Sequence, residues 1–477
     1  MSQKTLKTDD TNKLIDSFDK AQDSEFHKKT LIISGMGFFT DAYDIFIIGV
    51  VTSLLPLSGW PKISNLNISI LDSSSLLAAA LGAMIFGRVI DKIGRGKIYG
   101  LEMFLLIVGA AGSSIITPTG NILALTVWRF ILGVGIGGDY ASSSVIMTEY
   151  SNTKSRGKWV GMVFSMQSIG FLAGPSITLA LLYFSVPVGI LWRLLLFFGA
   201  IPAMVVIYYR KKMPETPRYA ASLGHLNKES ISQLEKYTGM KLNEGENTER
   251  LRKMSFNEIL YDRRLLLLII GTSMSWFLMD WALYGNTIMS DFMISSVVPT
   301  TLKGLSEVYY KTEITGIIFA LFAFPGYWIA TFTIDRIGRK LIQSIGFSMM
   351  AITFGLLFLF PFIETASYVT SFILIYGLSY FFIEFGPNLT TFVYPPEVFP
   401  AQARGTGTGI AASAGKIGAF LGTFLNLLIQ SAIGTSGLFS ILAVFSAVGL
   451  IITLILLPEP KKKDLGSSSG ENLYLTS

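Results

Sequence analysis

The feature that most constrains this chain is a series of apolar segments, each close to the length of a membrane-spanning helix. An α-helix needs about 20 apolar residues to cross the roughly 30 Å hydrocarbon core of a bilayer. Only 15% of the 477 residues are charged, against about 25% in an average soluble protein. We therefore predict an all-α polytopic membrane protein and exclude a β-barrel, whose strands would be short segments of alternating hydrophobicity. About twelve segments qualify, at residues 30–55, 72–91, 97–117, 121–150, 157–183, 189–209, 264–296, 312–334, 340–362, 367–394, 405–432 and 436–457.

Basic residues are concentrated in alternate loops, and this bias orients the chain. Lysines and arginines lie before the first apolar segment, after each even-numbered one and throughout a long polar stretch between the sixth and seventh. Because basic loops stay on the cytoplasmic side, we predict a multi-pass protein of the cell membrane with both termini in the cytoplasm. The predicted parts are an N-terminal segment (1–29), a first helical bundle (30–209), a cytoplasmic linker (210–263), a second bundle (264–457) and a cytoplasmic tail (458–477).

The chain contains an internal repeat at matched positions of the two bundles. Residues 87–97 read GRVIDKIGRGK and residues 331–340 read TFTIDRIGRK, and each copy follows the second apolar segment of its bundle. Gly94 and Gly338 permit a tight bend that other residues resist. Two six-helix bundles related by an axis along the membrane normal are the architecture of major facilitator transporters, which is the fold that we predict.

Several further motifs extend this likeness over residues 30–457. PETPRY (214–219) and PPEVFPAQARGTGTG (395–409) resemble motifs of sugar porters and their relatives. More specific motifs resemble those of the phosphate:proton symporter family: GFFTDAYDIF (37–46), GGDYASSSVIMTEYS (137–151), FGPNLTTFVYPPEVFP (385–400) and AASAGK (411–416). One motif departs from the family pattern, since Ala141 and Ser142 stand where the family has Pro-Leu. This departure leaves a proton-coupled porter of a sugar or a small organic anion as the alternative.

Asp280, the only charged side chain between Arg264 and Asp291, is the strongest functional signal. Trp276, Asp280 and Tyr284 are spaced i, i+4, i+8 and so form one stripe along a helix. Charged residues at bilayer depth are costly and generally serve function. Withdrawal from water favours the protonated form of a carboxyl group, as proton coupling requires. We therefore predict that Asp280 is both a substrate-site residue and the coupling acid.

The remaining predicted substrate residues come from other segments. Lys416 lies among small residues that permit close helix approach, where it could hold an anion or pair with Asp280. The alternative is a lysine whose amine reaches the membrane surface. The family resemblance implies that Tyr140, Gln167 and Asn388 coordinate phosphate together with the Trp276–Asp280–Tyr284 stripe.

Two further sets of charged residues are expected to serve coupling and gating. Asp41, Asp44, Asp139 and Glu102 resemble a proton path, with a structural salt-bridge cluster as the alternative, and Arg129 could neutralise Glu102 or Asp139. Charged residues at the predicted cytoplasmic helix ends are expected to form inter-helix salt bridges that lock the outward-facing state: Asp91, Arg95, Glu149, Arg156, Glu215, Arg218, Asp335, Arg339, Glu397 and Arg404.

These observations predict a proton-coupled importer of inorganic phosphate that works by alternating access. No Walker motif, no cysteine and only two histidines occur, so we expect no ATP drive, no cofactor, no metal site and no enzymatic activity. The expected partners are phosphate, protons and the lipid bilayer, with no nucleic acid, and the functional unit is expected to be a monomer. A non-transporting nutrient sensor is a remote alternative. The last residues, GSSSGENLYLTS (466–477), are typical of an artificial linker with a protease-site remnant.

Overall fold

The computed structural model describes Asp19, Met254 and residues 22–222, 228–239, 256–288 and 293–474, and this part of the chain is helical without strands. The first bundle contains α2 (Glu25–Leu54), α3 (Asn65–Ile93), α4 (Arg95–Ile98), α5 (Leu101–Ala111), α6 (Ile122–Tyr150), α7 (Arg156–Tyr183), α8 (Val188–Phe198) and α9 (Ala200–Arg210). The second contains α13 (Arg263–Thr287), α15 (Leu305–Ile318), α16 (Phe324–Ile337), α17 (Arg339–Leu359), α18 (Val369–Ile383), α19 (Leu389–Val398) and α20 (Arg404–Leu456).

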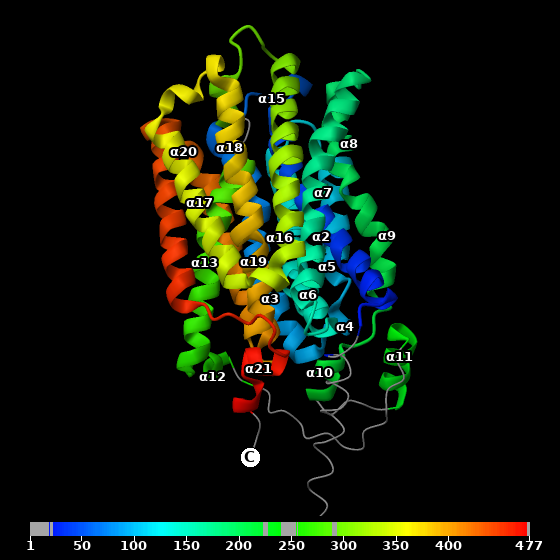
Figure 1. Cartoon of the computed structure of the whole chain (residues 1–477). Helices are drawn as coiled ribbons and strands as arrows, with labels where there is room; N and C mark the ends of the chain where they lie inside the picture. The colour runs from blue at the N-terminus through cyan, green and yellow to red at the C-terminus, as the bar shows by residue number, and fades with distance from the viewer. Residues whose placement is uncertain are drawn as a thin grey trace, which may run out of the picture.

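Short helices gather at one end of the molecule (Figure 1). They are α10 (Pro217–Ser222), α11 (Lys228–Thr238) and α12 (Phe256–Tyr261) between the bundles, and α21 (Leu465–Ser469) after the last long helix. Short turns η1 (Leu55–Ser58), η3 (Ser295–Val297), η5 (Pro361–Glu364), η6 (Ala366–Tyr368) and η8 (Glu471–Tyr474) lie between or after the long helices. We call the end with α10, α12 and α21 the basic end.

The described residues confirm the predicted number of membrane-spanning segments. Eleven helical segments are long and apolar enough to span a membrane. The longest, α20, has 53 residues and would be roughly 80 Å long if straight, more than twice the thickness of a bilayer core. It bends at Gly434, whose φ of +76° is the left-handed conformation that glycine tolerates. The helix α20 therefore contains two membrane-spanning segments, which brings the number of such segments to twelve.

The repeated motif forms the tight bends that its glycines predict. Gly94 and Gly338 have φ values of +120° and +106°, and they separate α3 from α4 and α16 from α17. Glycines also allow the bundles to meet, because a Cβ atom on Gly87 of α3 would lie 2.5 Å from the carbonyl oxygen of Gly405 on α20. The two bundles therefore pack backbone to backbone near the basic end.

Wide helical turns interrupt several spans, and one of them positions side chains at the centre of the molecule. The π-helical turns are η2 (Gly112–Ile116), η4 (Phe319–Ala323) and η7 (Glu384–Asn388). In η7, Gly386 has non-helical φ and ψ angles of −109° and −111°, and the following Pro387 lacks an N–H group. Glu384 and Asn388, at the two ends of this turn, are both buried.

Candidate functional site

An ion pair joins α13 and α20 on the side of the second bundle that faces the first. The Lys416 Nζ atom donates hydrogen bonds to Asp280 Oδ2 at 3.0 Å and to the Tyr284 hydroxyl at 3.0 Å. All three side chains are buried. A Cβ atom on Gly415 would lie 2.5 Å from the Trp276 ring, so the small residue beside Lys416 lets α20 approach the indole. The structure thus brings the predicted stripe and the predicted lysine together.

Residues from the first bundle complete this centre. The Tyr140 hydroxyl of α6 lies 2.9 Å from the Tyr284 hydroxyl, and Gln167 of α7 donates to Tyr140 at 2.5 Å. The Lys416 ammonium group lies 4.0 Å from the centre of the Tyr140 ring and 4.2 Å from that of Tyr284, within the range of cation–π attraction. The centre therefore lies between the two bundles.

Two residues that the sequence did not single out extend the network. Tyr327 of α16 donates to Gln167 Oε1 at 3.0 Å, and Asn388 donates to the Tyr327 hydroxyl at 2.7 Å. Asn388 also donates to the carboxylate of Glu384. Tyr327 carried no sequence signal, since aromatics are common in apolar segments, whereas Glu384 is an acid in a predicted span, as Asp280 is. We call the set of Tyr140, Gln167, Asp280, Tyr284, Tyr327, Asn388 and Lys416 the central network.

The departure from the family motif lies outside this network. Ala141 is buried, and the Ser142 hydroxyl donates to the Gly138 carbonyl of its own helix at 2.8 Å. Neither side chain makes a polar contact with a residue of the central network.

Two acids of the predicted proton path bind an arginine that the sequence did not single out. Arg210, the last residue of α9, donates to Asp139 at 2.6 and 3.1 Å and to Glu102 at 3.0 Å. The expected pairing of Arg129 with Glu102 or Asp139 is wrong, because Arg129 lies 3.9 Å from the Asp44 carboxylate. Its guanidinium also donates to the Asp44 carbonyl at 2.5 Å.

Asp41 is the one acid of the predicted proton path that has no arginine within ion-pair distance among the described residues. Both of its carboxylate oxygens are buried and have no hydrogen-bond partner among the described residues. Arg210 and Lys416 are both close enough to Asp41 to interact with it electrostatically. Asp41 thus interacts with a cation of each group, Arg210 in the first bundle and Lys416 in the central network.

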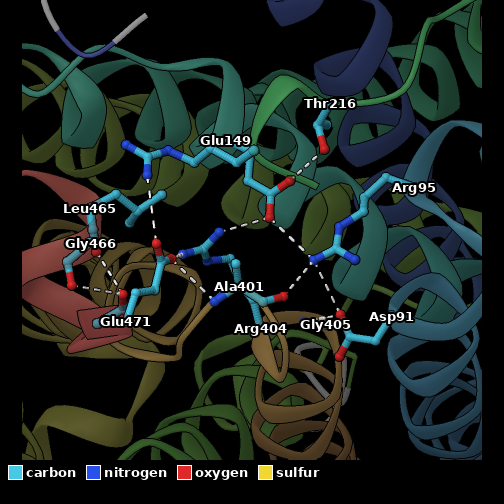
Figure 2. A network of polar contacts seen from close by, with 12 residues as sticks. Asp91, Arg95, Glu149, Thr216, Ala401, Arg404, Gly405, Leu465, Gly466 and Glu471 are labelled. Atoms are coloured by element: carbon cyan, nitrogen blue, oxygen red, sulfur yellow. Dashed lines mark hydrogen bonds and ion pairs between the residues drawn. The ribbon is translucent and has the colours of Figure 1, made fainter. Parts of the chain in front are cut away.

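Ion pairs connect the two bundles at the basic end (Figure 2). Glu149 of α6 accepts from Arg95 at 3.2 Å and from Arg404 of the second bundle at 2.7 Å. Asp91 pairs with Arg95 at 3.2 Å and accepts from the backbone N–H groups of Gly405 and Thr406 at 3.0 and 2.6 Å. The structure thus brings these four predicted gate residues together in contacts between helices.

The second copy of the motif repeats this arrangement with the roles of the bundles exchanged. Glu397 accepts from Arg156 of the first bundle at 3.0 Å and from Arg339 at 2.6 Å. Asp335 pairs with Arg339 at 2.9 Å and accepts from the N–H groups of Gly157 and Lys158 at 3.1 and 2.8 Å. We call the two arrangements together the gate cluster.

Two of the predicted gate residues lie outside these two arrangements. Glu215 accepts from the backbone N–H groups of Arg95 and Gly96 at 3.0 and 3.3 Å, so it caps the start of α4 and does not bridge helices with its own ion pair. Burial raises the pKa of Glu215, and the nearby Arg95 opposes this shift. Arg218 pairs with Asp19 at 2.5 Å and lies 3.9 Å from Glu471.

The C-terminal tail takes part in the gate cluster. Glu471 accepts from Arg404 at 2.5 Å and from the Ala401 N–H group at 3.2 Å (Figure 2). The Ser468 hydroxyl of α21 donates to the Glu397 carbonyl at 2.9 Å. Ser468 and Glu471, which the sequence predicted to belong to an artificial linker, therefore contact both arrangements of the gate cluster.

Known proteins similar to this chain are membrane transporters. The chain matches the family described as Sugar (and other) transporter over residues 29–469, a range that includes α21. It is 34% identical to Probable inorganic phosphate transporter 1-12 of Oryza sativa subsp. japonica, over 96% of this chain and 94% of that relative. It is also 34% identical to Inorganic phosphate transporter 1-1 of Arabidopsis thaliana, over 96% of this chain and 97% of that relative.

Solved structures with a similar fold include that of the proton:xylose symporter XylE bound to 6-bromo-6-deoxy-D-glucose. The TM-score is 0.73 at 19% identity, over 95% of this chain and 100% of that one. The partially occluded inward-open conformation of XylE from E. coli has a TM-score of 0.72 at 18% identity, over 91% and 99% of the two chains. These structural similarities show that this chain has the same fold as XylE.

Proposed function

Because this chain belongs to the phosphate:proton symporter family of the major facilitator superfamily, we propose that it imports inorganic phosphate together with protons by alternating access. The observation that carries the proposal is the buried Lys416–Asp280 pair, with 3.0 Å between Nζ and Oδ2, at the interface of the two bundles. A single cation shared with a single acid is suited to an anion that arrives with a proton.

The coupling follows from the charges of this pair. Removing one partner of a buried ion pair typically costs about 3–5 kcal/mol, because a charge is left without compensation. If an anion binds Lys416 while Asp280 is ionised, the Asp280 carboxylate loses its ion-pair partner and lies beside a second negative charge. If Asp280 is protonated, Lys416 can bind the anion and Asp280 can donate a hydrogen bond to it. Phosphate and proton therefore bind together more favourably than either alone.

The neutral groups of the central network suit an oxyanion. Tyr140, Tyr284 and Tyr327 carry hydroxyls that can donate, and Gln167 and Asn388 carry amide N–H groups. In the structure these groups bond to one another in an unbroken series from Lys416 to Asn388. Phosphate that enters this series exchanges bonds within the network for bonds to its own oxygens. The side chains of Ala141 and Ser142 take no part, so the departure from the family motif does not argue for another substrate.

The acids of the first bundle form the proposed proton path to this site. Glu102 and Asp139 share Arg210, and Asp41 interacts electrostatically with both Arg210 and Lys416. A carboxyl group without a hydrogen-bond partner is more stable neutral than charged when buried. Asp41 is therefore the acid best suited to pass a proton between the Arg210 cluster and the central network.

The gate cluster supports the alternating-access part of the proposal. Its ion pairs join the two bundles, so they must break before the bundles can separate at the basic end. Basic loops favour the cytoplasmic side, which makes this end the cytoplasmic face and leaves both termini in the cytoplasm. The bundles proposed to move against each other are residues 30–209 and 264–457, in a multi-pass protein of the cell membrane.

The proposal is tested by uptake of radiolabelled phosphate into proteoliposomes with and without an inward proton gradient. Unlabelled arsenate, sulfate, glucose and a carboxylate serve as competitors. We expect gradient-dependent uptake that arsenate blocks and glucose does not. Uptake of glucose or of the carboxylate in place of phosphate would support a sugar or organic-anion porter, and no uptake of any solute by folded protein would support the sensor alternative.

A further inference from the structure

Glu384 is a buried acid next to the central network that has no role in the mechanism described above. It begins η7, its side chain is 0% exposed, and one oxygen, Oε2, accepts a hydrogen bond from Asn388. The other oxygen, Oε1, has no hydrogen-bond partner among the described residues. No lysine, arginine or histidine of the described chain forms an ion pair with it.

The groups that face Glu384 are neutral or acidic. They are the Tyr327 phenol from α16, the Tyr380 phenol from α18 and, as the nearest charge, Asp280 from α13. The nearest cation in the centre, Lys416, is held by Asp280 and Tyr284. Gly326 of α16 packs closely against the base of the Glu384 side chain, since a Cβ atom on Gly326 would lie 3.0 Å from the Glu384 Cβ.

Asn388 links the charge state of Glu384 to the occupancy of the site. Its amide has two N–H groups, and one donates to Tyr327 while the other donates to Glu384. If Asn388 turns an N–H group toward a bound anion, an ionised Glu384 loses its donor and gains a negative neighbour. Both changes disfavour the charged form, so the loaded site favours a protonated Glu384.

We propose that Glu384 is a second proton-carrying residue, which takes up a proton when the site is loaded and releases it after the anion has left. This inference rests on the proposed function and adds to it one proton for each phosphate transported, carried by the second bundle. The proton comes from the outer solution and is delivered to the inner one, and no bond other than the carboxyl O–H forms or breaks. One further positive charge therefore crosses the membrane in each cycle.

The first measurement is the number of protons taken up when phosphate binds to the purified full-length protein. Calorimetry of phosphate binding in buffers of different ionisation enthalpy yields this number without any requirement for transport. We expect the Glu384→Gln variant to bind phosphate and to take up about one proton fewer than the wild type. Equal proton uptake would overturn the proposal, since Glu384 would then keep its proton throughout. Loss of phosphate binding would also overturn it, since Glu384 would then be a ligand and not a carrier.

The second measurement is the membrane potential at which net phosphate flux stops in proteoliposomes with fixed phosphate and pH gradients. We expect this potential to shift in Glu384→Gln to the value for one proton fewer in each cycle, and to stay near the wild-type value in Glu384→Asp, which keeps a carboxyl group. Glu364→Gln is the matched control, since Glu364 lies in η5 between α17 and α18 and makes no contact with the central network. An unshifted potential in Glu384→Gln overturns the inference alone. Absence of phosphate transport by the wild type overturns the proposed function.

Discussion

The charged groups at the centre of the molecule and those at its basic end are arranged in opposite ways. In the gate cluster, Glu149 and Glu397 each bond to two arginines. In the centre, Asp41 and Glu384 have no basic ion-pair partner among the described residues, and Asp280 has one lysine and one unbonded oxygen. Fully paired carboxylates remain charged and hold the bundles together, whereas poorly paired ones are suited to gain and lose protons.

The largest effect is expected at the centre, where removal of the one paired acid should break the proposed coupling. In Asp280→Asn, Lys416 keeps its full charge but loses its carboxylate partner. No carboxylate then competes with the bound anion for Lys416, so the anion is released more slowly. We expect gradient-driven accumulation to fall by about 100-fold or more, in keeping with about 3–5 kcal/mol for a broken buried pair. Radiolabelled phosphate uptake with and without a proton gradient measures this effect. Asp280→Glu is the control, and accumulation by Asp280→Asn at the wild-type level would contradict the role of Asp280.

A smaller effect is expected from removal of one charge from the gate cluster. Glu149→Gln leaves Arg95 and Arg404 facing each other, which favours separation of the bundles at the basic end. The chain has no cysteine, so a single Thr331→Cys substitution introduces its one thiol, at a buried site where Thr331 bonds to Ser165 at 2.7 Å. We expect labelling of this thiol to become at least about tenfold faster, because a broken buried pair costs several kcal/mol.

An exposed ion pair provides the control for the gate experiment. Glu25 and Lys28 pair at 2.7 Å, with side chains that are 88% and 64% exposed. Exposed pairs contribute little, so Glu25→Gln should leave the labelling rate of the introduced thiol unchanged. Equal labelling rates in the Glu149→Gln and wild-type backgrounds would show that the gate cluster does not limit opening.

A substitution in the C-terminal tail tests whether the gate cluster depends on residues outside the two bundles. Glu471→Gln keeps the hydrogen bond from Ala401 but removes the charge that Arg404 contacts. We expect roughly two- to fivefold faster labelling of the same introduced thiol, because hydrogen bonds to charged groups contribute about 1 kcal/mol more than neutral ones. Ser467→Ala is the matched control, since Ser467 is exposed and bonds to Asp464 within the same segment. A labelling rate unchanged by Glu471→Gln would mean that the tail does not stabilise the closed gate.

The smallest effect is expected from an unpaired acid that lies outside both regions. Burial raises the pKa of Glu364 from 4.5 to about 7. Because this pKa is higher in the folded state, its contribution to stability is complete below about pH 4.5 and is lost as the pH rises through about 7. Glu364→Gln should remove this loss. The melting temperature at pH 8 minus that at pH 5 should therefore be higher in the variant than in the wild type, by on the order of 2 °C. An identical pH dependence of melting in both proteins would contradict the assignment, and phosphate uptake should not change.

Features that depend on one segment at a time could be predicted from the sequence. The spans follow from hydrophobicity, and the bends at Gly94 and Gly338 follow from the repeated motif. The Trp276–Asp280–Tyr284 stripe follows from the helical period. The signal that identifies Asp280, an acid in an apolar span, is equally present at Glu384.

Contacts between segments could not be predicted in the same way. Arg210 is 71 residues from Asp139, and Arg129 is nearer in sequence but pairs with Asp44. Tyr327 had no distinguishing signal until the structure showed its hydroxyl between Gln167 and Asn388. The composition of the tail suggested an appended linker, whereas its contacts with Arg404 and Glu397 depend on the fold of both bundles.

By itself, the sequence determined that this protein is a helical membrane protein of two related halves, with a carboxylate, an indole and a phenol on one stripe in the second half. Those properties are local, because hydrophobicity, turn preference and helical spacing act over a few residues. Only the tertiary structure decided which carboxylates are paired and which are not. Pairing depends on distances between helices that are far apart in the chain, and these distances are set by the packing of all the helices together.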